Sequence, residues 1–185
     1  MKVAVFKESL LNNDEVTNKI SSSFLWGMAK DNDLDIRTLD VSKEFSKAKV
    51  NEAVDFADFI IIVSHIPDWG IPGGTCDVMQ LCGKRIKEKN YHDKQVVIIY
   101  AAEGSCAETH TTTVYRVLDY HLYGVIRHYL YLYQVDAMTE DILSALEESG
   151  EEYAEKKAFS KETYIKVTKR AMSFDEYKEF RINKK

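Results

Sequence analysis

The chain has 185 residues, of which 45% are hydrophobic and 30% charged, a composition typical of a globular domain rather than a disordered segment. Its net charge of −5 disfavours a general nucleic-acid binder, because such a protein must neutralise phosphates. No apolar run approaches the roughly 20 residues of a membrane helix, and the N-terminus turns polar too soon for a signal peptide. Three cysteines without a CxxC pair are typical of a reduced compartment, so we expect a cytoplasmic protein with no metal site.

The first part of the chain predicts three strands separated by two helices. Residues 2–6 are rich in valine and predict a strand, and apolar residues at four-residue spacing then predict a helix over about 14–30. Residues 34–39 alternate between apolar and polar, as in an outer strand with one wet face. A short helix near 49–56 leads into residues 57–64, where an unbroken β-branched and aromatic run is typical of a strand buried on both faces.

The second part continues this alternation. A helix over 75–89 precedes a second doubly buried strand at 95–102. A helix over about 108–122 then precedes an aromatic and β-branched strand at 125–133. A charged amphipathic helix over 138–155 closes the series.

Five strands alternating with helices predict a doubly wound α/β domain with a parallel sheet and helices on both faces. The G-x-G-x-x-G fingerprint of dinucleotide-binding folds is absent after the first strand. This favours a flavodoxin-like three-layer sandwich, whose five-stranded sheet has the order 2-1-3-4-5. We expect residues 1–155 to form this domain and residues 156–185 to extend it as a C-terminal helical segment.

The loop that follows residues 57–64 is the strongest candidate for a ligand site. It holds two prolines, three glycines and Trp69. Ligands of open α/β sheets bind where loops leave the carboxyl ends of the strands, and a tryptophan ring can stack on a planar ligand. Packing of Trp69 against its own protein is the alternative. His65 opens this loop, either as a satisfied structural histidine or as a hydrogen-bond donor to a ligand.

With this loop the chain resembles the flavodoxin-like flavoproteins, and among them the NAD(P)H-dependent FMN reductase and quinone reductase branch, over about residues 1–150. Trp69-Gly70 and Pro72 match a family segment that packs on the flavin ring. Residues 102–105, Ala-Glu-Gly-Ser, match a small-residue loop beside the flavin. Residues 9–17 correspond to the family's phosphate loop, which opens the first helix.

The resemblance implies a non-covalent FMN site built from three loops. The implied cofactor-binding residues are Ser9, Asn13 and Thr17 in the first loop, Ile66, Pro67, Asp68, Trp69 and Gly70 in the second, and Ala102, Glu103 and Gly104 in the third. We expect the first three residues and the helix-start amides to bind the phosphate, with Glu8, Asp14 and Glu15 turned outward. A capped surface helix that binds no phosphate is the alternative.

The implied activity is that of an FMN-dependent oxidoreductase, which takes electrons from NADPH or NADH and reduces a quinone, flavin, nitro or azo acceptor. The flavin supplies the chemistry in such enzymes, so no catalytic side chain is assigned. A flavodoxin-type electron carrier and a cofactor-free binding module of the same fold remain alternatives. We expect a homodimer formed by the helix at 75–89, the helix at 108–122 and the segment 156–185, because related reductases close their pocket with a second subunit and residues 115–133 are rich in tyrosine.

Overall fold

The computed structural model describes residues 1–9, 14–43, 45–66, 72–102, 120–122, 124–133 and 140–161. The strands in these ranges are β1 (Lys2–Ser9), β2 (Asp35–Asp40), β3 (Phe59–Ile66), β4 (Gln95–Ala102) and β5 (Ile126–Tyr133). The helices are α1 (Asp14–Ala29), α2 (Lys47–Phe56), α3 (Gly73–Lys89) and α5 (Glu140–Lys156). No helix in these ranges is both long enough and apolar enough to cross a membrane.

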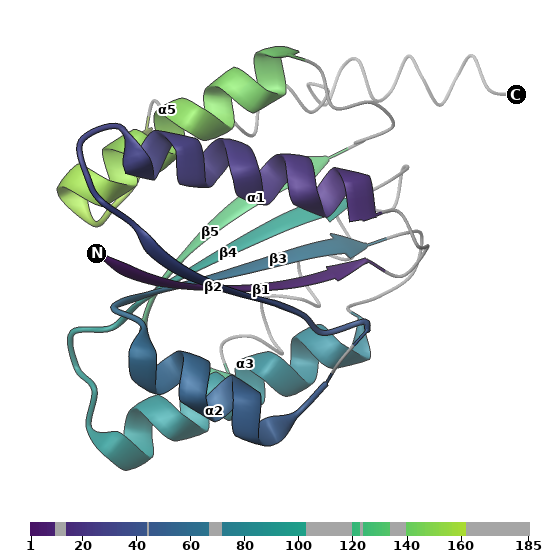
Figure 1. Cartoon of the computed structure of the whole chain (residues 1–185), viewed down its shortest axis with the longest axis vertical. Coiled ribbons are helices and arrows are strands. Elements are labelled where there is room, and N and C mark those ends of the chain that lie inside the picture. The colour runs from purple at the N-terminus through teal and green to yellow at the C-terminus, as the bar shows by residue number, and fades with distance from the viewer. Residues whose placement is uncertain are drawn as a thin grey trace, which may run out of the picture.

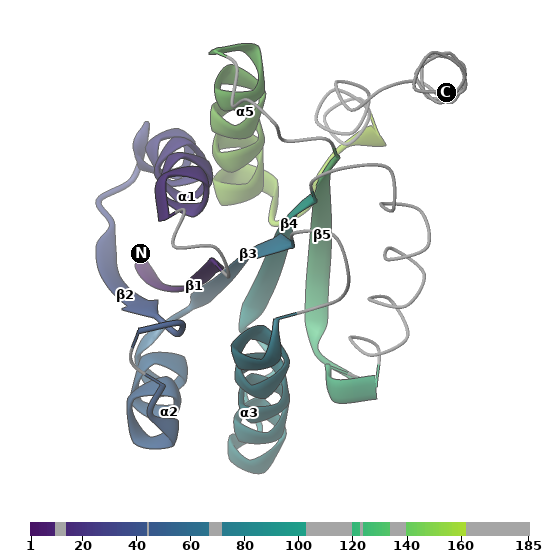
Figure 2. The same ribbon diagram turned by 90° about the vertical axis from the view of Figure 1, so that its right-hand side faces the viewer.

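The strands form one parallel sheet in the order β2-β1-β3-β4-β5, which confirms the predicted architecture. Helices α1 and α5 cover one face of the sheet, and α2 and α3 cover the other (Figures 1 and 2). From β1 the chain moves outward to β2 and then returns past β1 to β3, so the direction of winding reverses between β1 and β3. In a sheet of this kind, that reversal is the place where ligands bind.

Each face of the sheet carries its own apolar core. Alternate residues of β3 point to opposite faces, so Ile60 and Ile62 pack toward α2 and α3, whereas Ile61 and Val63 pack toward α1 and α5. All four are at most 1% exposed. Burial on both faces explains why β3 has an unbroken apolar sequence instead of an alternating one.

β1 is longer than the sequence predicts. We expected it to end at Phe6, but it continues to Ser9, so Lys7 and Glu8 belong to the strand and not to the loop. Pairing with both neighbours explains the difference, since Lys7 pairs with Asp40 of β2 and Ser9 with His65 of β3. These ladders supply backbone hydrogen bonds whatever the polarity of the side chains.

The other described strands and helices lie within two residues of their predicted bounds. The expected helix over 108–122 lies outside the described residues except for its last three positions. The expected C-terminal segment 156–185 is described only as far as residue 161. Both therefore remain predictions.

Two glycines bring α1 and α5 into backbone contact. A Cβ atom on Gly27 of α1 would lie 1.8 Å from the carbonyl oxygen of Glu147, and one on Gly150 of α5 would lie 2.0 Å from the carbonyl oxygen of Phe24. Neither position has room for a side chain. The spacing of these two helices therefore depends on glycine at both places.

Candidate functional site

The carboxyl ends of β1, β3 and β4 lie side by side at one edge of the sheet (Figure 1). Ser9 at the end of β1 pairs with His65, and Ile66 at the end of β3 pairs with Ala102 at the end of β4. The three loops in which we predict cofactor-binding residues therefore leave the sheet from adjacent positions. Two of these strands, β1 and β3, flank the reversal of winding, where ligands of doubly wound sheets bind.

Four of the predicted cofactor-binding residues lie in the described part of the chain. Ser9, Ile66 and Ala102 are the last residues of their strands. Thr17 lies at the start of α1 and is 1% exposed, and its carbonyl accepts a hydrogen bond from the Ser21 hydroxyl at 2.8 Å. The remaining predicted residues lie outside the described ranges: Asn13, Pro67, Asp68, Trp69, Gly70, Glu103 and Gly104.

Glu8 does not turn outward as we expected. Its side chain is 5% exposed, and its carboxylate accepts hydrogen bonds from the Gly74 N–H at 3.2 Å, from the Thr75 N–H and from the Thr75 hydroxyl at 2.6 Å. The first turn of α3 has amides that lack partners within the helix, and its positive end attracts a carboxylate. That attraction overrides the solvent exposure expected of a glutamate.

Lys7 faces the opposite side of the sheet, toward α1. Its ammonium group donates a hydrogen bond to the side-chain oxygen of Asn18, on the second turn of α1. Sequence reasoning did not select Lys7, because the predicted strand ended at Phe6 and no local pattern links Lys7 to α1. A cation beside the beginning of α1 adds to the positive potential of the helix N-terminus.

Glu15 points to solvent, as expected. Its side chain is 71% exposed, and its carboxylate lies 2.6 Å from the Lys19 ammonium. The hydrogen bond from Lys19 lowers the pKa of Glu15 below its ordinary value. This acidic side chain is neutralised on the outer surface of α1, so it does not oppose an anion at the N-terminus of the helix. The side chain of Asp14 lies outside the described residues.

The described cysteines are not activated nucleophiles. Burial raises the pKa of the Cys82 thiol, which is fully buried, and burial followed by the charge of Glu8 raises the pKa of the half-buried Cys76 thiol. Both thiols therefore stay protonated at neutral pH. Within the described ranges, no group of three His, Cys, Asp or Glu side chains is arranged to hold a metal ion.

The fold and the converging strand ends define a doubly wound α/β protein with a ligand-binding edge. No family model and no curated protein matches the sequence, whereas many solved structures match the fold. The Flv1 flavodiiron core from Synechocystis sp. PCC6803 has a TM-score of 0.65 at 13% identity, over 84% of this chain and 35% of that chain. An NADH:FMN oxidoreductase (EMOB) in its apo form has a TM-score of 0.59 at 18% identity, over 88% of this chain and 93% of that chain.

A WrbA-like flavodoxin from Agrobacterium tumefaciens has a TM-score of 0.55 at 15% identity, over 83% of this chain and 95% of that chain. The chain spans only 35% of the flavodiiron core, so the likeness to that protein concerns one part of it. Taken with the strand order, these structures show that the chain has the flavodoxin-like fold.

Proposed function

We propose that the protein binds FMN non-covalently and acts as an NAD(P)H-dependent oxidoreductase. The observation that carries the proposal is the convergence of the β1, β3 and β4 carboxyl ends at the reversal of winding. Structures of similar fold support it: one is named an NADH:FMN oxidoreductase and another an oxidised Flavodoxin 1 from Bacillus cereus. The first is similar over 93% of its own length.

The described residues fit the phosphate end of FMN at α1 and not at α3. The first-turn amides of α3 already bind Glu8, so they are not available to a second anion. The N-terminus of α1 has the Lys7 ammonium nearby and its Glu15 carboxylate turned to solvent. Positive potential, with the described carboxylate of Glu15 turned away, suits a phosphate dianion. Ser9, Asn13 and Thr17 remain the proposed phosphate-binding residues.

The ring of FMN is proposed to bind between the loops after β3 and β4. One loop contributes Ile66, Pro67, Asp68, Trp69 and Gly70, and the other contributes Ala102, Glu103 and Gly104. When bound there, FMN supplies the redox chemistry, taking a hydride from NADH or NADPH and passing electrons to a quinone, flavin, nitro or azo acceptor. The protein supplies binding, orientation and exclusion of water.

An electron carrier is the second candidate. It is favoured by a flavodoxin from Streptococcus pneumoniae TIGR4, which has a TM-score of 0.54 at 15% identity and is covered over 100% of its length. A carrier and a reductase share the cofactor and differ in their reaction with a nicotinamide. Oxidation of NADH or NADPH by the FMN-loaded protein, with menadione as acceptor, separates them.

Flavin titration tests the proposal directly. Because the phosphate contributes to binding at a helix N-terminus, we expect FMN to bind at least about tenfold more tightly than riboflavin. Trp69→Ala should weaken FMN binding by about 1–3 kcal/mol, the scale of one aromatic stacking contact. Trp26→Ala is the matched control, because the chain has two tryptophans and Trp26 is 72% exposed near the far end of α1. A folded protein that binds neither flavin would contradict the proposal and favour a cofactor-free binding module.

A further inference from the structure

We propose that Glu8 is a positioning residue for the cofactor end of the sheet. It holds the first turn of α3 against the end of β1, and so fixes the places where the chain leaves β3 at Ile66 and returns at Pro72. The effect on FMN binding rests on the function proposed above. The anchoring itself rests on the contacts of Glu8 alone.

Glu8 replaces a cap that α3 lacks. The N-cap residue of α3 is Pro72, whose side chain makes no capping hydrogen bond. An ordinary N-cap side chain accepts a hydrogen bond from the second or third amide of its helix. Glu8 accepts from those two amides, Gly74 and Thr75, although it lies 66 and 67 residues earlier in the chain. A residue of the central sheet thus caps this helix, and the cap ties the helix to the sheet.

The network reaches β3 through Thr75. The Thr75 hydroxyl donates to Glu8 at 2.6 Å and lies 3.1 Å from the hydroxyl of Ser64, near the end of β3. Because the Thr75 hydroxyl has a single proton, Ser64 donates in this second bond. Both hydroxyl residues are at most 1% exposed. One buried network therefore joins β1, β3 and α3 on both sides of the segment 67–71.

Burial of a carboxylate costs free energy, because the charge loses its hydration. In the described part of the chain, Glu8 is the one acidic residue that is buried. An apolar side chain of similar volume would stabilise the core at least as well, but it would not fix the direction of a helix. Gly74 shows how closely the parts fit, since a Cβ atom there would lie 2.8 Å from Glu8 Oε1. A Cβ atom on Gly73 would meet nothing within 4 Å.

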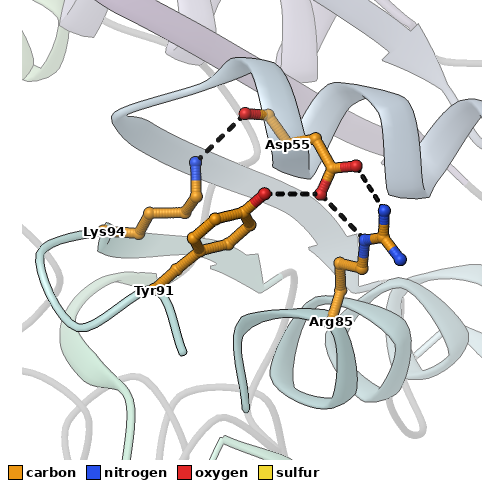
Figure 3. Close-up of polar contacts among 4 residues, drawn as sticks. All are labelled: Asp55, Arg85, Tyr91 and Lys94. Carbon is orange, nitrogen blue, oxygen red and sulfur yellow. Dashed lines mark hydrogen bonds and ion pairs between the residues drawn. The ribbon is translucent and has the colours of Figure 1, made fainter. Parts of the chain in front are cut away.

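The opposite end of α3 offers a matched comparison (Figure 3). Asp55 of α2 accepts hydrogen bonds from Arg85 Nε of α3 at 2.8 Å and from the Tyr91 hydroxyl at 3.2 Å, while Lys94 donates to the Asp55 carbonyl at 3.4 Å. This carboxylate also anchors α3, but it lies at the amino ends of β3 and β4. Loss of Asp55 should destabilise the protein without altering the cofactor end.

The experiment compares Glu8→Gln and Gly74→Ala with Gly73→Ala and Asp55→Asn. Gln keeps the size of Glu8 but points an N–H donor at other donors, and Ala at position 74 pushes the carboxylate away. In both variants we expect amide hydrogen exchange at residues 73–76 to accelerate about tenfold and the FMN dissociation constant to rise about tenfold, since buried donors lose their acceptor. The visible circular dichroism of bound FMN should change as well.

The controls define what overturns the inference. Gly73→Ala should leave exchange at residues 74–76 and FMN affinity unchanged, and Asp55→Asn should lower the melting temperature while leaving FMN affinity and circular dichroism unchanged. Unchanged exchange in both Glu8→Gln and Gly74→Ala overturns the proposal. So does an equal loss of FMN affinity in Asp55→Asn and Glu8→Gln. If the wild-type protein binds no FMN, the proposed function fails, and faster exchange confined to residues 73–76 still upholds the anchoring.

Discussion

His128 on β5 is surrounded by aromatic rings. Its imidazole lies edge-on to Tyr153 at 5.3 Å and to Phe159 at 6.0 Å between ring centroids. Its buried Nε2 has no hydrogen-bond partner in the described part of the chain. Burial therefore lowers the pKa of His128 below its ordinary value of 6.5.

This shift predicts a loss of stability in mild acid. As the pH falls below 6.5, the unfolded chain takes up a proton before the folded protein does. The contribution of neutral His128 is thus fully present above this pH and is lost as the pH falls toward the folded pKa. His128→Phe keeps a ring in the cluster and should reduce the fall in urea midpoint between about pH 7.5 and about pH 5.5.

The exposed His92 provides the control for this prediction. His92→Asn should leave the pH dependence of the wild-type protein intact. If His128→Phe shows the same fall in midpoint as the wild-type protein, the acid sensitivity comes from other groups.

Side chains at the site were predictable only where their partners are local. Glu15 and Lys19 lie one helical turn apart, and the outward direction of Glu15 follows from the helix pattern. The partners of Glu8 are 66 and 67 residues away, so no local pattern indicates its burial. The site residues in the segment 67–71 and at Glu103 and Gly104 remain predictions.

At the scale of elements, the contact between α1 and α5 depends on Gly27 and Gly150. Replacing either glycine by alanine must separate the two backbones, because the added Cβ would overlap a carbonyl oxygen. We expect Gly27→Ala and Gly150→Ala each to lower the free energy of unfolding by about 1–3 kcal/mol or more, the usual cost of overpacking. Urea denaturation followed by circular dichroism measures the change.

Gly73→Ala is the control for helical glycines in general. A Cβ atom at position 73 meets nothing within 4 Å, so the variant should not be destabilised. Its free energy of unfolding should rise slightly, because alanine has a better helix propensity than glycine. If Gly27→Ala and Gly150→Ala are as stable as Gly73→Ala, then α1 and α5 can move apart without a loss of stability, and their backbone contact does not stabilise the protein.

Strands and helices followed well from periodicity where both faces are buried. The unbroken apolar runs at β3 and β4 predicted the positions of these strands. The spacing of Val78, Leu81, Cys82 and Ile86 predicts the inner face of α3, and all are at most 5% exposed except Leu81, which is partly buried. The end of β1 did not follow, because pairing with two neighbouring strands extends it past the last apolar residue. Sequence periodicity reflects the burial of side chains and does not indicate which strands pair.

At the scale of the whole molecule, we propose a homodimer. The structure adds a reason to the expectation from sequence, since Ile126, the first residue of the edge strand β5, is 48% exposed and Tyr120, six residues earlier in the chain, is 80% exposed. Tyrosine and apolar side chains are favoured at the centre of interfaces. Light scattering should give twice the chain mass of 21.3 kDa, and the double variant Tyr120→Glu with Ile126→Lys should give the mass of one chain.

A monomer mass for the FMN-loaded protein at tens of micromolar would reject this dimer. If the double variant still has the mass of a dimer, the interface lies away from β5. The unmodified protein at the same concentrations is the reference for both measurements.

Synthesis of the chain completes the β2 side of the sheet before the side that contains β4 and β5. Once Ile66 has emerged from the ribosome, β1, β2 and β3 can pair as three of the five strands, with β1 between the other two. β3 is buried on both faces in the finished protein. Until β4 has emerged as far as Ala102, however, the edge of β3 that pairs with β4 has no neighbouring strand. An exposed apolar edge invites pairing with other nascent chains, so ribosome pausing between these two points favours aggregation over folding.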